Sequence, residues 1–391
     1  MAQETDLRTL VVVRTLKMGG MERVAVNLAD AFAEAGHESH LLFFRKEKQA
    51  LAPEHPEVKV HHFPLHWAQR LSGIGLFLEA LSRWLLNPLI RRSHFVWTGG
   101  LGGLLLRRWL NRFERRHGRL DRIVFRGIGT FEQVWSFRDD RAYFVLENIL
   151  RPRGSGWKRR LYARCLFQGK HLVAVSQGVA DTAEQARRSW QFQPASLSVI
   201  VNPCPLKSIR QRSLSQEPDL PNEPYIVNVA RLVPAKDHAL LLRAYARAQP
   251  REALVIVGDG GQRRSLEALA RELGIAERVY FVGHRDNPYP WMRAARLFVL
   301  SSRFEGLGIV LLEALACGTP VLSVDSVGGI REVLKGPLER CIVARDEASL
   351  AEGITHALAS APFDIDDAWL QDFQPARVVE RFLQPPAPPR A

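Results

Sequence analysis

Between residues 225 and 359 short apolar runs alternate with segments of helical periodicity, and this alternation limits the fold more than any other feature. The apolar runs are too brief for helices and are typical of buried strands; they cover residues 225–229, 253–257, 278–282, 297–300, 320–324 and 340–343. Helix-spaced segments fall between and after them, at residues 237–248, 262–273, 307–316 and 349–359. Such alternation predicts a doubly wound α/β domain with a parallel sheet.

The first half of the chain begins in a similar way. An apolar run at residues 9–13 leads through the glycine pair Gly19-Gly20 into a helix-spaced segment that ends near Gly36, and residues 40–44 form a second apolar run. This strand–helix–strand pattern predicts a second parallel sheet. Its further strands are expected at residues 122–125, 142–146, 171–175 and 198–201.

A polar, proline-rich stretch separates the two halves and is typical of an inter-domain linker. We expect an N-terminal domain at residues 1–203, the linker at 204–224, a C-terminal domain at 225–362, a further segment at 363–384 and a disordered, proline-rich tail at 385–391.

Polar residues and glycines follow five strands of the second half, at the carboxyl ends where parallel sheets bind ligands. These positions are Arg231, the turn Gly258-Asp259-Gly260, the turn Gly283-His284-Arg285, and the loops 301–308 and 325–329. The turn Gly258-Asp259-Gly260, like Gly19-Gly20 in the first half, is also compatible with a purely structural role. Five loops rich in polar residues and glycine at one rim nevertheless predict a binding site.

Two cations and two acids stand out at this rim. Arg231 and Lys236 would stabilise the negative charge that grows on a diphosphate leaving group, although surface cations paired with acids are an equal alternative. Glu305 precedes the helix that carries Glu313, and a fully helical path would separate them by ~12 Å on faces ~80° apart. They would then touch two parts of one long ligand.

The turn Gly306-Leu307-Gly308 lies between these glutamates. Backbone N–H groups at the start of the following helix suit a phosphate. Glu313 would accept the hydroxyls of a ribose; a solvated helical glutamate is the alternative, but an unpaired carboxylate in a helix of Leu, Ile, Val and Ala is unfavourable. The pattern predicts a site for a sugar nucleotide.

The net charge of the 391-residue chain is +13, and much of the excess is local. Arginines mix with tryptophans and aliphatic residues between Arg83 and Arg126, with only Glu114 and Asp121 as acids. No apolar run there is long enough to span a bilayer, but a basic, tryptophan-bearing segment suits an anionic membrane surface. A solvated helix face over a core is the alternative; nucleic acid is a third reading that no recognition motif supports.

Metal and disulfide chemistry are not indicated. Cys165, Cys204, Cys317 and Cys341 are widely spaced, which fits a reducing compartment. The only Asp-x-Asp spacing is at residues 364–366, beyond the last predicted strand of the alternation, which favours cations over a divalent metal ion at the site. No signal peptide is visible at the N-terminus, and we expect a cytoplasmic protein.

The chain resembles retaining glycosyltransferases of family 4. The resemblance spans nearly the whole length and rests on GGMERVAVNLADAFAEAGH, AVSQGV, VIVNP, NVARLVPAKDHALLLRAYA, LVIVGDG, ERVYFVGHRDN, FVLSSRFEGLGIVLLEALACGTPV and VGGIREV. It implies the GT-B fold, in which two Rossmann-like domains face each other across a cleft, and a nucleotide-diphosphate sugar as donor with no cofactor.

The resemblance also implies roles for individual residues. Arg231 and Lys236 would hold the donor diphosphate, Glu305 would lie by the donor sugar and Glu313 would bind the ribose. The backbone of residues 283–285 would meet the base, and Gly20 would lie near the phosphates or the acceptor. The segment at 363–384, with Trp369, Phe373, Val379 and Phe382, resembles one that crosses back to the first domain.

The chain departs from the family at several positions. Ala230 and Asp237 stand where glycine is usual, and Asp237 is expected to cap a helix. No histidine ends a central strand of the first domain; Arg126, Glu147 and Asn148 are the candidate substitutes.

We expect transfer of a sugar, with retained configuration, to lipopolysaccharide core or an undecaprenyl-diphosphate saccharide at the inner face of the cytoplasmic membrane. The alternatives are a soluble acceptor or a non-catalytic sugar-nucleotide-binding protein.

Overall fold

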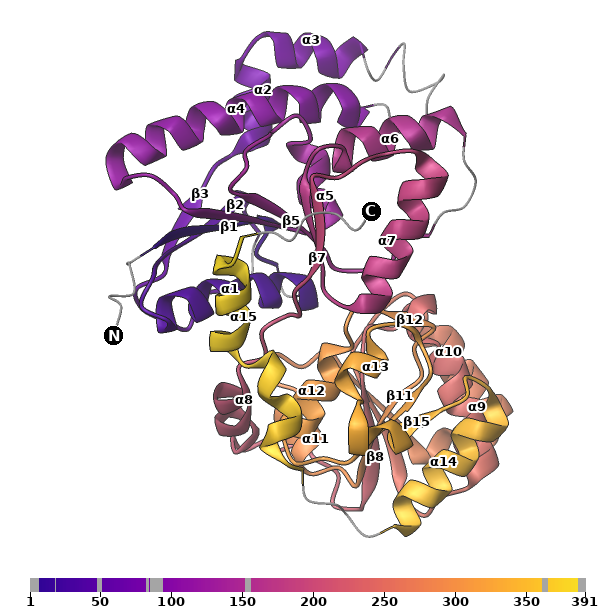
Figure 1. The fold of residues 1–391 in the computed structure, drawn as a ribbon. Helices are drawn as coiled ribbons and strands as arrows, with labels where there is room; N and C mark the ends of the chain where they lie inside the picture. The colour runs from indigo at the N-terminus through magenta and orange to yellow at the C-terminus, as the bar shows by residue number, and fades with distance from the viewer. Residues whose placement is uncertain are drawn as a thin grey trace. The chain divides into compact units, whose positions relative to one another are not determined.

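The computed structural model describes residues 7–17, 19–47, 51–81, 84, 94–151, 156–360 and 365–385. The chain divides into two compact units, each with its own parallel sheet (Figure 1). Unit 1 comprises Met1–Pro203 and Pro375–Ala391, and unit 2 comprises Cys204–Gln374. The two parallel sheets confirm the α/β prediction. Arg83, Asp364 and residues 386–391, which entered the sequence predictions, lie outside the described residues.

Unit 1 is built on a seven-stranded sheet in the order β3-β2-β1-β4-β5-β6-β7. Its strands are β1 (Arg8–Thr15), β2 (Glu38–Arg45), β3 (Lys59–His62), β4 (Arg122–Arg126), β5 (Ala142–Leu146), β6 (His171–Ala174) and β7 (Ser196–Val199). The central strand β1 pairs Val11 with Leu41 on one side and with Val124 on the other. Its residues 10–13 are fully buried because helices cover both faces of a parallel sheet.

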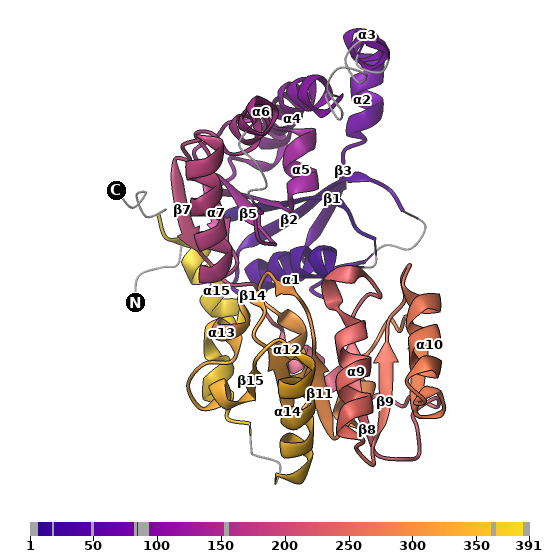
Figure 2. The ribbon, with the colours of Figure 1, turned by 90° about the vertical axis from the view of Figure 1, so that its right-hand side faces the viewer.

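The helices of unit 1 lie on both faces of this sheet (Figures 1 and 2), with α1 and α4 on opposite sides. They are α1 (Gly20–Glu34), α2 (Leu65–Leu71), α3 (Ile74–Leu81), α4 (His94–His117), α5 (Ile128–Gln133), α6 (Trp157–Phe167), α7 (Gln177–Trp190) and α15 (Pro375–Leu383). A glycine face lets α4 approach α5 closely: a Cβ on Gly99 or Gly102 would lie 2.0 Å from a backbone carbonyl oxygen of residues 132–133.

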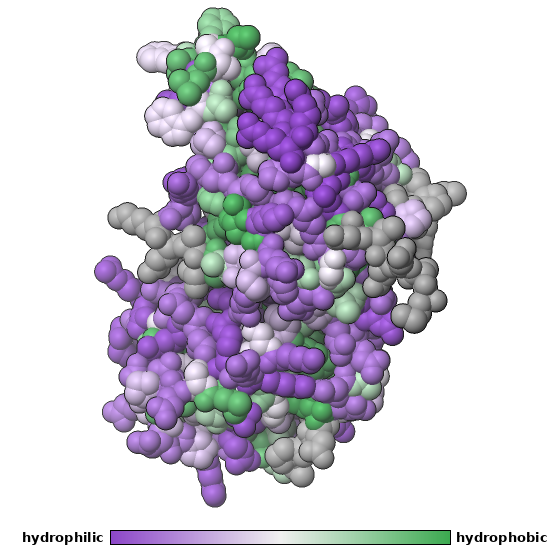
Figure 3. Space-filling view, turned by 90° about the vertical axis from the view of Figure 1, so that its left-hand side faces the viewer, coloured by the Kyte–Doolittle hydropathy of each residue, from purple (hydrophilic) through white to green (hydrophobic). Residues whose placement is uncertain are grey.

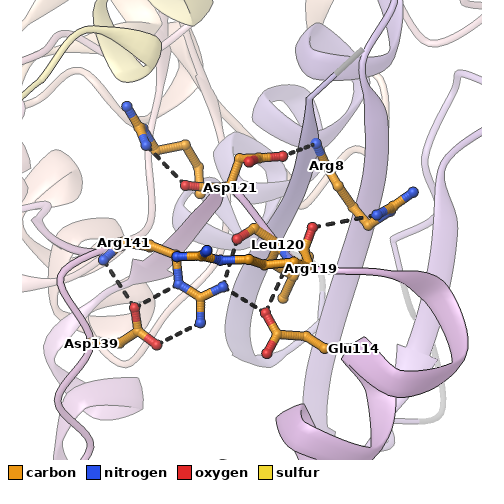
Figure 4. Close-up of polar contacts among 8 residues, drawn as sticks. Arg8, Glu114, Arg119, Leu120, Asp121, Asp139 and Arg141 are labelled. Atoms are coloured by element: carbon orange, nitrogen blue, oxygen red, sulfur yellow. Dashed lines mark hydrogen bonds and ion pairs between the residues drawn. The ribbon is translucent and has the colours of Figure 1, made fainter. Parts of the chain in front are cut away.

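The carboxyl end of α4 is fixed to the sheet by a network around Arg141 (Figure 4). Arg141 lies 2.6 Å from Glu114 of α4 and 2.7 Å from Asp139. Hydrogen bonds from Arg141 lower the pKa of Asp139, although burial opposes this shift. Glu114 also accepts a 3.0 Å hydrogen bond from the Leu120 N–H. Its carboxylate therefore binds both the turn between α4 and β4 and the side chain of Arg141.

Helix α15 belongs to unit 1, although it follows unit 2 in the chain. Phe382 packs edge-on against Phe32 of α1, with 6.3 Å between ring centroids. Arg122 donates hydrogen bonds to the carbonyl oxygens of Phe382 and Leu383, at 3.0 and 2.8 Å. A guanidinium at this position satisfies carbonyls that a helix leaves open at its end.

Unit 2 is built on a six-stranded parallel sheet in the order β10-β9-β8-β11-β13-β15. Its strands are β8 (Tyr225–Val229), β9 (Ala253–Val257), β10 (Val279–Gly283), β11 (Leu297–Leu300), β13 (Val321–Val324) and β15 (Ile342–Val343), and β12 (Phe304–Glu305) pairs separately with β14 (Val327–Gly328). The α-helices are α8 (Leu206–Ser213), α9 (His238–Ala248), α10 (Arg263–Glu272), α11 (Tyr289–Arg293), α12 (Ile309–Ala316), α13 (Ile330–Val333) and α14 (Glu347–Ala359).

Two expected segments differ from the structure. Residues 204–224, expected as a linker, belong to unit 2 and contain α8, whose buried side chains include Leu206 and Ile209. The segment expected at 363–384 divides: residues up to Gln374 belong to unit 2 and those from Pro375 belong to unit 1. Phe373 is buried, and its carbonyl oxygen accepts a 2.8 Å hydrogen bond from the Cys204 N–H.

Candidate functional site

The strand order of unit 2 reverses between β8 and β11, where connections run to opposite sides of the sheet. The loops that follow these two strands diverge at such a point, and ligands of open α/β sheets bind there. Lys236 lies in the loop after β8, and Glu305 lies in β12 within the connection after β11. The structure therefore brings two of the predicted site residues to the same edge position.

Lys236 and Glu305 are in direct contact. The Lys236 Nζ atom lies 2.5 Å from Glu305 Oε1, and the Ser302 hydroxyl donates to the same carboxylate oxygen at 2.6 Å. The side chains of Lys236 and Glu305 are 23% and 10% exposed. A charged pair with one open side can exchange part of its contact for a ligand without leaving a charge unpaired.

Hydrogen bonds hold the two loops at this distance. The Ser301 hydroxyl donates to the Lys236 carbonyl oxygen at 3.0 Å, and the Arg303 N–H donates to the Ala235 carbonyl oxygen at 2.9 Å. A third loop closes on the pair, because a Cβ on Gly328 would lie 1.6 Å from the Glu305 carbonyl oxygen. Only glycine allows that approach, and Gly328 has a φ of 126°.

Asp237 has a different role from the one expected. It occupies the N-cap position of α9, as expected, but it adopts the left-handed conformation with a φ of 49° and its side chain makes no capping hydrogen bond. Its buried carboxylate instead pairs with Arg303 at 2.9 Å and with Arg345 at 3.1 Å. Asp237 thereby ties the residue after Lys236 to the loop that carries Glu305.

Arg231 lies in the same loop as Lys236, directly after β8. Its side chain is exposed and makes no hydrogen bond or ion pair within the described part of the chain. The loop backbone packs closely on the next one: a Cβ on Gly258 would lie 2.0 Å from the Ala230 carbonyl oxygen. Arg231 is thus a free cation on a fixed backbone.

Glu313 and Glu305 contact different residues. Tyr289 of α11 donates a 3.3 Å hydrogen bond to Glu313 Oε1, so the carboxylate has a partner and the argument from an unpaired acid weakens. The estimate for a helical path does not apply, because Glu305 lies in β12 and α12 begins only at Ile309.

The glycine turn before α12 has the geometry that a helix start requires. Gly308 has a φ of 82° and occupies the position before the first helical residue, and no side chain caps the helix there. Leu307 is buried, while Gly306 precedes it in the same turn. The first turn of α12 is therefore shaped by backbone rather than by a capping side chain.

The turn after β10 presents its backbone. Gly283 has a φ of 79° and accepts a 2.8 Å hydrogen bond from the Gly258 N–H. The His284 side chain is exposed and lies 3.4 Å from Asp286. Arg285 pairs with Asp219 at 2.9 Å and lies over the Trp291 ring, so its side chain is already occupied.

In unit 1, Gly20 begins α1 in open space: within the described part of the chain, no heavy atom beyond its chain neighbours and the helix's own backbone lies within 4 Å of a Cβ built on it. Arg126 and Glu147, at the carboxyl ends of β4 and β5, form a buried ion pair at 2.6 Å. Asn202 bridges them, accepting from Arg126 at 2.7 Å and donating to Glu147 at 3.3 Å. Burial raises the pKa of Glu147, with the charge of Arg126 opposing the shift. Asn148 is exposed.

Sequence reasoning did not single out Ser302, Arg303, Arg345 or Asn202. Each acts on another side chain across the fold, and no local pattern marks such a partner. The described residues contain no helix that is long and apolar enough to cross a membrane.

Two family models match the chain, and together they span most of it. The model described as Glycosyltransferase Family 4 matches residues 18–207, and the model described as Glycosyl transferases group 1 matches residues 210–366.

Relatives and solved structures resemble the chain. A 4-alpha-N-acetylgalactosaminyltransferase of Campylobacter jejuni, named for its N-acetylgalactosamine-N,N'-diacetylbacillosaminyl-diphospho-undecaprenol acceptor, is 37% identical over 38% of this chain and 40% of its own. The lipopolysaccharide core biosynthesis glycosyltransferase LpsE of Rhizobium meliloti is 42% identical over 40% of this chain and 44% of its own. The chain thus matches less than half the length of these relatives. Anabaena HepE, solved with UDP and glucose, shares the fold with a TM-score of 0.66 at 18% identity over 96% of this chain and 98% of its own.

Proposed function

Because the chain belongs to glycosyltransferase family 4 and has the GT-B fold, we propose that it transfers a sugar from a nucleotide-diphosphate sugar to a hydroxyl of a lipid-linked or anionic envelope glycan. The contact between Lys236 and Glu305 carries this proposal, because it gathers a cation and an acid at the switch point of the unit 2 sheet.

In this proposal Lys236 and Arg231 bind the donor diphosphate. Negative charge grows on that group as the sugar leaves, and fixed cations stabilise it more in the transition state than in the ground state. Arg231 has no protein partner within the described residues, and Lys236 is held by Glu305 and by backbone contacts. The Lys236 side chain is 23% exposed, so it can contact a ligand on its open side while it stays paired with Glu305.

Glu305 lies by the donor sugar, where its carboxylate accepts a hydrogen bond from a sugar hydroxyl or stabilises positive charge at the anomeric carbon. Glu313, with Tyr289 orienting its carboxylate, accepts ribose hydroxyls. The backbone at Gly283, His284 and Arg285 meets the base, and the turn of Gly306, Leu307 and Gly308 meets phosphate oxygens through N–H groups.

We further propose that the anomeric configuration is retained and that the reaction needs no metal ion. The bond from the anomeric carbon to the diphosphate oxygen breaks, and the acceptor oxygen forms its bond on the same face. The departing phosphate takes the proton of the acceptor hydroxyl, so no strong protein base is required.

The acceptor class is supported by the names of the relatives. One is named for a diphospho-undecaprenol acceptor and another for lipopolysaccharide core biosynthesis. Both acceptor types are amphiphilic and anionic, and α4 offers exposed arginines, including Arg108, Arg112 and Arg116. We place the reaction at the inner face of the cytoplasmic membrane, with the basic segment toward anionic lipid.

Arg126, Glu147 and Asn202 are the candidates for positioning the acceptor. They come together at the carboxyl edge of the unit 1 sheet, where ligands of such sheets bind. A buried ion pair, here with side chains 1% and 8% exposed, is a poor source of stability compared with apolar packing, which favours a functional reason for this one.

The test is to incubate the purified chain with UDP-, GDP- and ADP-sugars, first in thermal shift and then for hydrolysis and transfer. A donor that binds only the folded chain raises its melting temperature. Hydrolysis or transfer that depends on Lys236 and Glu305 supports the proposal. Binding without any turnover would favour the non-catalytic alternative, and transfer only to soluble sugars would favour the soluble-acceptor alternative.

A further inference from the structure

The pair of helices α2 and α3 exposes large apolar side chains to solvent. Trp67 is 60% exposed, Leu71 83%, Ile74 63% and Phe77 66%. Figures 1 and 2 both place α3 on the outer side of unit 1, farther from the sheet than α4. We name residues 65–81 the apolar hairpin. Exposed apolar patches of this kind mark sites that contact another protein or a membrane.

The pattern of α3 is inverted relative to an ordinary surface helix. Its buried positions are Gly75 and the acidic Glu79, whereas Ile74, Leu76 and Phe77 face outward. The Glu79 carboxylate is held inside by Arg70 at 3.1 Å. A helix on a core in water buries its apolar stripe and exposes its charges. This helix does the opposite, so its outward face is suited to an apolar environment.

The apolar hairpin is an ordered surface. Gln69 of α2 donates a 2.7 Å hydrogen bond to the Thr98 carbonyl oxygen of α4. Ser72 closes the turn: its hydroxyl donates to the Gln69 carbonyl oxygen at 2.6 Å and accepts from the Gly75 N–H at 3.1 Å. The apolar side chains are therefore presented by a fixed scaffold that needs no folding on contact.

Helix α4, on which the hairpin packs, also carries positive charge toward its carboxyl end. Arg108, Arg112 and Arg116 are exposed and have no ion-pair partner in the described residues. The single acid of α4, Glu114, is neutralised by Arg141 at 2.6 Å. Figure 3 shows the hydrophobic side chains gathered at one end of unit 1, with strongly hydrophilic ones next to them. An apolar tip that shares a unit with exposed cations matches the acyl boundary and the anionic headgroups of a membrane.

We propose that the apolar hairpin inserts Trp67, Leu71, Ile74 and Phe77 into the headgroup–acyl boundary of an anionic bilayer, while the α4 arginines bind the lipid phosphates. The insertion deepens the membrane contact of the proposed function and rests on it, but it does not depend on sugar transfer. Insertion also changes how membrane binding is expected to depend on salt. Charge attraction fades as salt screens it, whereas burial of apolar side chains persists.

The experiment is sedimentation of the full chain with vesicles of phosphatidylcholine, with and without phosphatidylglycerol. It is run at about 0.1 M and about 1 M salt, where the Debye length falls from ~10 Å to ~3 Å. The variant Leu71→Ser/Phe77→Ser removes two inserting side chains, and Leu214→Ser is the control, since Leu214 is an exposed leucine of unit 2 (65%, against 83% for Leu71). The variant Arg112→Gln/Arg116→Gln removes charge alone.

We expect the unaltered chain to bind anionic vesicles and to keep part of that binding at high salt. The hairpin variant should bind at least about tenfold more weakly and lose the salt-resistant part, because each side chain buries apolar area. The arginine variant should lose affinity chiefly at low salt, and Leu214→Ser should bind normally. Equal melting temperatures would establish that all variants are folded.

A second readout tests depth directly. Lipids with brominated acyl chains should quench tryptophan fluorescence of the bound chain, and Trp67→Phe should reduce that quenching. Unchanged binding by the hairpin variant, or no binding to any vesicle, would overturn the proposal. So would a chain that dimerises through the hairpin, seen as a monomer only in Leu71→Ser/Phe77→Ser. Donor hydrolysis in solution, measured in parallel, shows separately whether the proposed reaction holds.

Discussion

Lys236 and Glu305, 69 residues apart in the chain, meet at 2.5 Å between the ammonium nitrogen and one carboxylate oxygen. Neither residue is free to move alone, because the Lys236 carbonyl oxygen accepts from Ser301 and the Glu305 carboxylate accepts from Ser302. The pair is therefore a preorganised unit whose charge is set before a ligand arrives. Preorganised charge of this kind is the largest source of transition-state stabilisation in many enzymes.

Replacing either member of this pair should abolish most turnover. We expect Lys236→Met and Glu305→Gln each to lower kcat for donor hydrolysis and transfer by about 100-fold or more. The folded state should survive, since the residues lie at the sheet rim and the substitutes are similar in size. Steady-state kinetics together with melting temperatures measure both effects.

The control for this pair is Lys335→Met. Lys335 also pairs with a carboxylate in unit 2, that of Asp372, but both side chains are about half exposed. Its loss should leave turnover unchanged, because exposed pairs contribute ~0–1 kcal/mol and this one is not at the switch point. Full activity in Lys236→Met or Glu305→Gln would refute the site assignment.

Asp237 should matter through the two arginines that it binds. We expect Asp237→Asn, which tolerates the left-handed conformation, to lower the free energy of unfolding by about 1 kcal/mol and kcat several-fold. Asp237→Ala should lose a further ~1 kcal/mol, because a Cβ without a local hydrogen-bonding group disfavours that conformation. Denaturant unfolding and kinetics on both variants give the comparison; an Asn variant as stable and active as the parent would show that the ion pairs are incidental.

Most of the fold is readable from the sequence where apolar runs are long and bounded by turns. The predicted strands at 225–229, 253–257 and 297–300 agree with β8, β9 and β11 to the residue. Strand β3 has no such signal, because Lys59–His62 is polar and lies at the sheet edge. Helix α3 escaped notice for a different reason: its apolar residues face outward, so its pattern does not point to a core.

The candidate site was readable only in part. Loops at the carboxyl ends of parallel strands can be located from the strand pattern, which is why Lys236 and Glu305 were named. Their contact, and the ties from Ser302 and Arg303, depend on how strands distant in sequence become neighbours. Glu313 shows the limit most clearly. The sequence argument assumed that its carboxylate has no partner in the protein, whereas Tyr289 donates a hydrogen bond to it.

The buried pair Arg126–Glu147 should show strong coupling. Replacing Arg126 by Met or Glu147 by Leu alone leaves one buried charge unpaired, which should lower the free energy of unfolding by about 3–5 kcal/mol. The double variant should recover much of that loss, because both charges are gone. A double-mutant cycle by denaturant unfolding measures the coupling energy, and additive single effects would show that the two charges do not interact.

The milder Glu147→Gln tests the acceptor side of the proposed reaction. It keeps the shape of the side chain, so donor hydrolysis should stay near the parent value while transfer to acceptor falls about tenfold or more. Equal transfer rates would remove Glu147 from the acceptor site. Loss of donor hydrolysis with unchanged folding would instead place it in the donor site.

Stability should depend on pH through His40, which is buried between β2, β3 and α4. Burial, with the nearby His61, lowers the pKa of His40 from 6.5 to about 4; Glu38 opposes this shift, while Lys59 and His117 add to it. In the unfolded chain His40 is protonated below pH 6.5, whereas in the folded chain it is protonated only below about pH 4. The contribution of His40 to stability is therefore full above pH 6.5 and declines toward pH 4, by at most on the order of 3 kcal/mol.

Denaturant unfolding between pH 7 and pH 4 measures this slope. His40→Gln should reduce the slope, and part of it should remain because burial also lowers the pKa of His61 and His62. His356→Gln, at an exposed position in unit 2, is the control and should leave the slope nearly unchanged. Glu38 titrates lower and does not obscure the window: burial raises its pKa, but hydrogen bonds from Lys59 and Arg8 prevail and hold it at about 2. The stabilisation from Glu38 is present above pH 4.5 and lost only as the pH falls toward 2. The same slope in His40→Gln would contradict the assignment.

Gly20 gives the cleanest separation of folding from ligand contact. Among the described residues, no atom beyond the chain neighbours and the helix's own backbone lies within 4 Å of a Cβ at this position, and alanine is favoured over glycine in a helix by up to ~1 kcal/mol. Gly20→Ala should therefore unfold at the same or a slightly higher temperature than the parent. If donor phosphates or the acceptor approach the backbone there, the added methyl group blocks them and turnover should fall about tenfold or more, mainly through KM. Gly156→Ala, at the N-cap of α6, is the kinetic control: no atom of the described residues outside its own chain neighbours lies within 4 Å of the added Cβ, and turnover should stay unchanged. Normal kinetics in Gly20→Ala would place the ligand away from the start of α1.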